Sequence, residues 1–231
     1  MRDYDLNEFR GVTRLFPLGG VVLFPHGVVP LHIFEPRYIQ MTNDALLSDR
    51  MITIIQPKLP VILTTDGPAL ESVGCLGQII QHERLPDGRF NLLLAGVTRV
   101  KLLEEMRTPG RLYREASCNV LEEFGLDTVS TPGMQELSER FLQLLDKTGL
   151  SSVEHVDLRR VFEELKNPSM MTDLVAQSLG LPPKVKQALL NEPSVPNRME
   201  QILGIMRILM SKQNSGENSE DREFPPKFSR N

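Results

Sequence analysis

Three side chains that could bind a metal ion lie within ten positions of one another near the start of this 231-residue chain. They are His26, His32 and Glu35, in the stretch FPHGVVPLHIFEPRY. In an extended segment side chains alternate between two faces, so the two histidines could share a face, but Glu35 would lie on the other. Neither a His-Glu-x-x-His pair nor a cysteine–histidine cluster completes a ligand set. We therefore expect no metal site, with His26 in a turn after Pro25 and His32 on a half-buried strand.

The motifs of nucleophilic and nucleotide chemistry are also missing from the sequence. The stretch TDGPAL, residues 65–70, is similar to the nucleophile region of a serine–lysine peptidase, but Ala69 stands where a nucleophilic oxygen would be needed. No Gly-x-Ser-x-Gly or Gly-x-Gly-x-x-Gly motif occurs, and no Gly-Lys dipeptide is available for a phosphate-binding loop. We expect a protein that is not an enzyme and uses no cofactor.

The elements that must position these residues change character along the chain. Up to about residue 122, short apolar segments alternate with Gly and Pro, which predicts strands. The segments are GVVPLHIF, MITIIQ, CLGQIIQHER, RFNLLLAG, VTRVKLL and YREASCNVL. LPDGRF predicts a hairpin turn, in which Pro86 and Asp87 lead to Gly88, the residue that accepts a positive φ. Because the connections are short, we expect an antiparallel or mixed sheet that is closed or strongly curved.

One helix, near residues 36–48, should interrupt the strands. Its predicted apolar face consists of Ile39, Thr42, Ala45 and Leu46. Pro36 suits the first helical turn, and Glu35 would lie at the positive end of the helix dipole. Arg37 is too close in sequence to pair with Glu35 as a helix neighbour, so its partner should come from elsewhere. We expect these residues and Tyr38 to have structural roles at a strand-to-helix junction.

From about residue 131 the apolar residues recur with the period of a helix. The apolar stripes are Met134, Leu137, Phe141, Leu144 and Leu145; Leu158, Val161, Phe162 and Leu165; Met171, Leu174, Val175, Ser178 and Leu179; and Met199, Ile202, Leu203, Met206, Leu209 and Met210. PKVKQALLN predicts a further short helix. We expect these stripes to pack as a core; a methionine-lined groove for a partner is the alternative. The fold class is therefore α+β, with a β part at 1–128, a helical part at 129–211 and a disordered polar tail at 212–231.

The composition narrows the class of protein. The formal net charge is −4, whereas nucleic-acid binders normally carry a basic excess. Cys75 and Cys118 lie far apart, as expected for free thiols in a reducing compartment. The start of the chain has no apolar region typical of a secretory signal, and prolines break the most apolar stretch. We expect a cytoplasmic protein without a membrane or nucleic-acid partner.

Three segments, in order, resemble the family of Lon protease N-terminal (substrate-binding) domains. LFPLGGVVLFPHGVVPLHIFEPRYIQM is similar to the opening of that domain. VGCLGQIIQHERLPDGRFNLLLAGVTRVKL is similar to its central hairpin, with a Leu-Pro-Asp-Gly turn and a following Gly-x-x-Arg. DLVAQSLGLPPKVKQALLNEPSVPNRMEQILGIM resembles its helical end. The resemblance covers roughly residues 12–210 and implies a curved, PUA-like pseudo-barrel followed by an α-helical bundle, with Pro25 and His26 in a turn.

The resemblance also implies a function. Whole Lon proteases continue into an ATPase and a serine–lysine peptidase domain, and we expect this chain to stop before both. We expect a non-catalytic module that binds unfolded or exposed segments of other proteins, as an adaptor or holdase in protein quality control, alongside a protease or chaperone. The predicted contact residues are Phe16, Phe24 and Phe34. Two alternatives stay open: a PUA-like nucleic-acid-binding protein, which would need a basic stripe, and a metal-dependent hydrolase using His26, His32 and Glu35.

Overall fold

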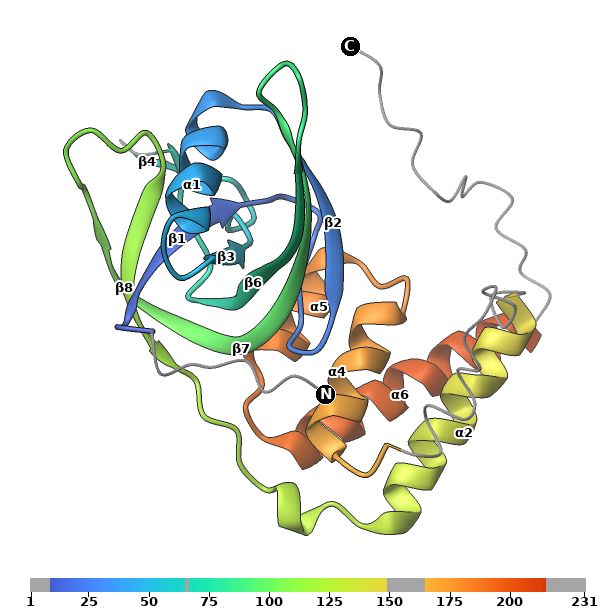
Figure 1. Ribbon diagram of the computed structural model, residues 1–231. Coiled ribbons are helices and arrows are strands. Elements are labelled where there is room, and N and C mark those ends of the chain that lie inside the picture. The colour runs from blue at the N-terminus through green and yellow to red at the C-terminus, as the bar shows by residue number, and fades with distance from the viewer. Residues whose placement is uncertain (1–8, 65–66, 149–164, 215–231) are drawn as a thin grey trace.

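The computed structural model describes residues 9–64, 67–148 and 165–214 and has a sheet part followed by a helical part (Figure 1). The main sheet is mixed and consists of β1 (Val12–Pro17), β2 (Val28–Ile33), β3 (Met51–Ile55), β6 (Val73–Arg84), β7 (Phe90–Met106) and β8 (Arg114–Val120). A small second sheet pairs β4 (Leu63–Thr64) with β5 (Gly67–Pro68).

The long strand β7 closes the main sheet into a barrel. The strand order is β2-β7-β6-β3-β1-β8, and β8 pairs with β7 as well as with β1. β7 pairs with β2 over residues 90–95, with β8 over residues 100–106, and with β6 over residues 90–101. Since β1 is parallel to β3 and antiparallel to β8, the sheet is mixed. The prediction of a mixed, closed or curved sheet is confirmed.

Two details of the strands differ from the prediction. β1 was not among the predicted strands, and the two segments RFNLLLAG and VTRVKLL form one strand, β7. Gly96 does not interrupt β7, but it admits the loop of residues 24–27 beside the strand. The His26 N–H donates to the Gly96 carbonyl at 2.9 Å, and the Gly96 N–H donates to the Gly27 carbonyl at 2.8 Å. A methyl group on Gly96 would lie 2.0 Å from the Phe24 carbonyl oxygen, so the close approach requires glycine.

The predicted hairpin turn joins β6 to β7. Gly88 has a φ of 85°, and its N–H donates to the Leu85 carbonyl at 2.9 Å. Asp87 forms an ion pair with Arg89 at 2.5 Å. The prediction for Pro86, Asp87 and Gly88 is confirmed as a structural turn.

The helices are α1 (Pro36–Leu46), the short 3-10 helix η2 (Leu126–Thr128), α2 (Thr131–Thr148), α4 (Pro168–Ser178), α5 (Pro183–Asn191) and α6 (Val195–Asn214). The buried face of α1 consists of Tyr38, Met41, Thr42 and Ala45, whereas Ile39 is only half-buried. Most of the predicted stripe at 158–165 lies outside the described residues. The helix α6 continues through residues 212–214, where the tail was expected to begin, and the remainder of that tail also lies outside the described residues.

One apolar core runs through both parts of the molecule. It contains Phe16, Phe24 and Phe90 from the sheet part and Phe141, Val175, Ile202 and Met206 from the helices. Figure 1 shows α4, α5 and α6 on one side of the barrel, with α2 beside α6. No helix in the described ranges is both long and apolar enough to cross a bilayer.

Candidate binding surface

Two of the three predicted contact residues belong to the core. Phe16 is 6% exposed and Phe24 is 0% exposed, and the Phe16 ring packs on Tyr38 with centroids 4.4 Å apart. The prediction for these two phenylalanines is wrong, because side chains that pack inside the barrel offer no surface to a bound chain. Phe34 follows β2 and is 60% exposed, so it alone of the three can contact a partner.

The three candidate metal ligands do not come together. His26 has a φ of 65° in the turn beside Gly96, and His32 is exposed on β2, where its Nδ1 lies 2.8 Å from Asn91 Oδ1. The expectation that His32 is half-buried is therefore wrong, since its side chain points outward from the strand. No group of three His, Cys, Asp or Glu side chains in the described parts of the chain could hold a metal ion.

The partner of Arg37 also differs from the prediction. Arg37 pairs with Glu35 at 2.7 Å, and both side chains are exposed. Glu35 is the N-cap residue and has an extended backbone with a φ of −73° and a ψ of 135°. It can therefore reach Arg37 from outside the helix, although residues two apart within a helix do not face each other.

Arg99, the last residue of the Gly-x-x-Arg segment, belongs to a buried ion cluster. We define this cluster as Arg99, Glu123, Asp173 and Arg198. Arg99 donates to both oxygens of Asp173, with Nη1 at 2.8 Å from Oδ2 and Nη2 at 2.5 Å from Oδ1. Glu123 Oε1 accepts from Arg99 at 2.8 Å and from Arg198 at 2.6 Å. Because Arg99 lies on β7, Asp173 on α4 and Arg198 on α6, the cluster joins the barrel to the helices.

The remaining donors of the buried ion cluster are occupied as well. Arg99 Nε donates to the Leu190 carbonyl at 3.0 Å, and Arg198 Nη1 donates to the Glu192 carbonyl at 2.8 Å. Burial alone would raise the pKa of the Glu123 carboxyl, but Arg198 and Arg99 outweigh it and hold this pKa below its ordinary value. The two arginines and the two carboxylates bond to one another and to neighbouring carbonyl and hydroxyl oxygens. The cluster is therefore suited to holding the fold together rather than to acting on a substrate.

A run of apolar side chains is exposed after β3. We define residues 57–64 as the apolar loop. Its exposed side chains are Leu59, Val61, Ile62 and Leu63, at 69%, 56%, 58% and 78% exposure. One exposed leucine is ordinary, but four large apolar residues within five positions form a patch of the kind that marks an interaction site.

The base of the apolar loop is held firmly against the barrel. The Gln56 side chain donates to the Leu18 carbonyl at 2.6 Å, and the Lys58 N–H donates to the Ala69 carbonyl at 2.8 Å. Leu70 is buried and packs on Leu15. The loop therefore presents its apolar side chains from a fixed base, which lowers the entropy lost when a partner binds.

A hollow of about 240 Å³ lies between the apolar loop and α5. Pro57 and Leu59 line it from the loop, and Lys184, Gln187 and Ala188 line it from α5. Together the loop and the hollow make a surface with an apolar face and polar groups at its rim, which is the usual composition of a binding site.

Sequence reasoning missed this surface. The available signal is LPVIL, residues 59–63, in which apolar residues follow one another without polar alternation, while Pro60 excludes a central strand.

A larger groove of about 830 Å³ lies between α2 and the start of α4, with Met134, Leu142 and Met171 in its lining. Of the methionines of α6, Met199 and Met206 are buried and Met210 is half-buried, and none of the three lines this groove.

The comparison with known families decides the class of protein. The model of the substrate-binding domain of ATP-dependent protease La (LON) matches residues 12–207. This chain belongs to that family. The identified domain is the substrate-binding domain and not a catalytic one, and the predicted family is confirmed.

The relatives are much longer than this chain. Lon protease 1 of Hydrogenovibrio crunogenus is 29% identical over 205 residues, which are 87% of this chain and 24% of that protein. Lon protease 1 of Thermus thermophilus is 27% identical over 197 residues, 83% of this chain and 24% of that protein. The chain thus spans about a quarter of the length of these two relatives.

Solved structures show the same fold. The N-terminal domain of a Mycobacterium avium complex Lon protease superposes with a TM-score of 0.67 at 16% identity, covering 85% of this chain and 98% of that one. A Lon N-terminal domain protein from Xanthomonas campestris has a TM-score of 0.61 at 19% identity, covering 84% of this chain and 97% of that one. The Lon N-terminal domain fold therefore extends over most of the chain.

Proposed function

We propose that this protein is a non-catalytic module that binds unfolded or exposed apolar segments of other proteins through its apolar loop. The observation that carries the proposal is the patch of Leu59, Val61, Ile62 and Leu63, which a member of a substrate-binding family exposes on a fixed base. Burying such side chains against a partner removes apolar surface from water, the main favourable term in association.

The wider role follows from the family. A module that binds exposed apolar segments can act as an adaptor that brings chains to a protease or as a holdase that keeps them soluble, and we propose this role in protein quality control. The closed sheet fits the PUA-like description that the resemblance implies. Cys75 and Cys118 are free and buried, which suits the proposed cytoplasmic location.

The test is titration of the full chain with an unfolded model protein. The chain has no tryptophan, so the tryptophan emission of a reduced, carboxymethylated model protein reports on that substrate alone. We expect micromolar or weaker binding, roughly −8 kcal/mol at most, and much weaker binding of the same model protein in its native form. Equal binding of the native and unfolded forms would contradict the proposed function.

Two sets of substitutions test whether the apolar loop is the binding surface. Replacing Leu59, Ile62 and Leu63 together by Ser should weaken binding about tenfold or more. A tenfold loss corresponds to roughly 1.4 kcal/mol of binding free energy. The matched control replaces Leu47, Phe124 and Ile208 by Ser, since these side chains are also exposed but lie on other elements. Melting temperatures should stay close to that of the unmodified protein for the loop variant. If the control variant loses as much affinity, the apolar loop is not the binding surface.

A further inference from the structure

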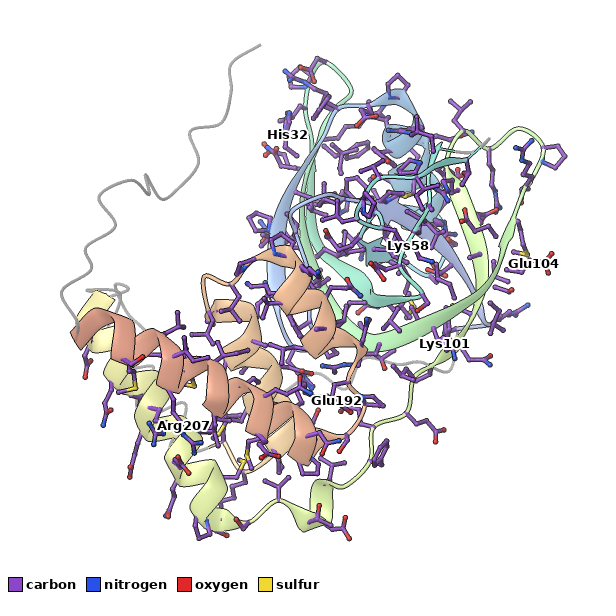
Figure 2. The ribbon with its side chains drawn as sticks, turned by 180° about the vertical axis from the view of Figure 1, so that it is seen from behind. His32, Lys58, Lys101, Glu104, Glu192 and Arg207 are labelled. Atoms are coloured by element: carbon purple, nitrogen blue, oxygen red, sulfur yellow. The ribbon has the colours of Figure 1, made fainter. Side chains whose placement is uncertain are left out.

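The strand β2 is an edge of the main sheet. In the described parts of the chain it pairs with β7 and with no other strand, so one of its two sides has no neighbouring strand. We call this side the free edge. Figure 1 shows β2 on the outer side of the barrel, and Figure 2 shows His32 of this strand apart from Lys58 of the apolar loop. The free edge and the apolar loop are therefore separate surfaces.

The pairing of β2 with β7 shows which backbone groups point toward the free edge. Gly96 of β7 bonds to the loop just before β2, where its N–H donates to the Gly27 carbonyl and its carbonyl accepts from the His26 N–H. Since alternate residues of a strand bond to the same side, the alternate residues of β7 before Gly96 also face β2. They stand opposite Val29, Leu31 and Ile33. The backbone groups that point the other way belong to Val28, Pro30 and His32.

A row of backbone groups on the free edge has no backbone partner among the described residues. It consists of the N–H groups of Val28 and His32 and the carbonyl groups of Val28, Pro30 and His32. Pro30 has no N–H, so the row lacks one donor at its centre. Because the remaining donors and acceptors follow the spacing of a strand, they match the backbone of a second extended chain.

The side chains beside the free edge are exposed and mostly apolar. Val28 is 48% exposed and Phe34 is 60% exposed, and Pro30 and His32 are exposed as well. The rings of His32 and Phe34 stack with their centroids 6.0 Å apart. β2 contains no Lys, Arg, Asp or Glu, although charged side chains are a common protection of strand edges. A strand added at this edge therefore contacts apolar side chains as well as backbone groups.

We propose that the free edge of β2 binds an extended segment of another polypeptide, which joins the sheet as a further strand. Backbone hydrogen bonds give this site affinity for many sequences, and the row of exposed side chains favours apolar segments. A second copy of this chain fits less well, because two β2 edges paired about a two-fold axis contain the missing Pro30 donor twice. The site is separate from the apolar loop and goes beyond the proposed function.

The test uses a short fluorescein-labelled peptide in which valine and threonine alternate. Its binding is followed by fluorescence anisotropy, with the loop variant in which Leu59, Ile62 and Leu63 are replaced by Ser, so that the apolar loop does not contribute. A second peptide has the same side chains but is N-methylated along its length, which removes its N–H donors. We expect the methylated peptide to bind at least about twentyfold more weakly, as for the loss of two or more hydrogen bonds.

Two substitutions at His32, made in the same loop variant, separate backbone from side-chain recognition. His32→Pro removes the N–H that points to the free edge, whereas the matched control His32→Ala keeps it, and both remove the imidazole. Because β7 bonds to the neighbouring residues of β2, the proline leaves that pairing intact. The proline variant should bind the unmethylated peptide about fivefold more weakly than the alanine variant, which corresponds to roughly 1 kcal/mol for one hydrogen bond.

Pro30→Ala changes the affinity in the opposite direction. It supplies the missing donor at the centre of the free edge, so the peptide should bind about fivefold tighter. The added donor also removes one protection of the edge, and sedimentation should show more self-association of this variant.

Three outcomes overturn the inference. They are equal binding of the two peptides, equal affinity of the two His32 variants, and an unchanged or weaker affinity of Pro30→Ala. If His32→Pro does not fold, the peptide pair and Pro30→Ala still decide. The proposed function is tested separately, because it depends on the loss of unfolded-protein binding in the loop variant, whereas the binding of the peptide should survive in that variant.

Discussion

At the scale of single residues, Arg99 should contribute strongly to stability. Replacing it by Met removes both hydrogen bonds that Asp173, a fully buried carboxylate, accepts from Arg99, and leaves it facing only Arg198 Nε at 3.3 Å. Removing one partner of a buried pair typically costs about 3–5 kcal/mol, because the other charge stays buried without compensation. Because Arg198 still faces Asp173 in this variant, we expect a loss at the lower end of this range in the free energy of unfolding, measured by urea denaturation.

The matched control for Arg99 is Arg207→Met. Arg207 pairs with Glu136 at 3.1 Å, but its side chain is 59% exposed. An exposed ion pair contributes roughly 0–1 kcal/mol, so this variant should unfold almost like the unmodified protein. Equal losses for the two variants would contradict a special role for the buried ion cluster.

His26 should make stability depend on pH in a defined window. Burial lowers the pKa of His26 below its ordinary value of 6.5, against the opposing attraction of Asp173 and Glu123. The unfolded chain therefore binds a proton at this position more readily than the folded one. The stability that neutral His26 allows is present above about pH 6.5 and is lost as the pH falls toward the lowered pKa.

A comparison with His26→Asn tests this. Asparagine tolerates the φ of 65° at this position and does not titrate. The melting temperature of the unmodified protein should fall more between pH ~7.5 and pH ~5.5 than that of the variant. Parallel curves for the two proteins would show that His26 does not control stability in this window.

At the scale of elements, two glycines should respond in opposite directions to the same change. Gly96→Ala would place a methyl group 2.0 Å from the Phe24 carbonyl oxygen and push the loop of residues 24–27 away from β7. We expect a loss of about 1–3 kcal/mol. Gly204 lies inside α6 with nothing within 4 Å of an added methyl group, so Gly204→Ala should gain about 0.5–1 kcal/mol.

Urea denaturation of the two alanine variants checks both signs. A destabilised Gly204→Ala would mean that α6 needs the glycine for a reason other than space. An unchanged stability of Gly96→Ala would mean that the contact between the 24–27 loop and β7 can relax without loss.

Gly96 shows why the strands and helices were predicted only in part. The alternation of apolar residues indicated most strands, and the turn at Gly88 needed only local chemistry. From the sequence, Gly96 was expected to separate two strands. What requires glycine at this position is a close contact with the loop of residues 24–27, which lies far away in the sequence. β1 was missed for a related cause: its place between β3 and β8 depends on pairing over long sequence distances.

The candidate site was less predictable than the fold. Phenylalanine is equally apolar in a core and in a binding patch, so the sequence could not separate Phe24, which is buried, from Phe34, which is exposed. The apolar loop was missed because an apolar segment usually signals burial. Its exposure follows from the prolines and from the anchoring of its base, which only the folded structure shows.

At the scale of the whole molecule, the sheet and helical parts should unfold together. They share one apolar core and the buried ion cluster, so neither part keeps its buried groups satisfied without the other. We expect a single calorimetric transition with equal calorimetric and van't Hoff enthalpies. A fragment of residues 1–128 should melt well below the full chain, because Arg99 then lacks Asp173 and Glu123 lacks Arg198.

Circular dichroism of the fragment provides the comparison. Two separate transitions in the full chain, one of them reproduced by the fragment, would show that residues 1–128 form an independent domain. In that case the ion cluster would act only as a contact between two stable units.

The position of β1 between β3 and β8 also has a consequence for synthesis on the ribosome. β1 can pair with β3 early, but its other edge waits for β8, roughly 100 residues later, which takes on the order of 5–20 s at typical translation rates. Arg99 likewise emerges 74 residues before Asp173. During this interval the nascent chain exposes an open strand edge and an unpaired arginine. A protein proposed to bind unfolded chains is thus, while it is being made, a chain of the same kind.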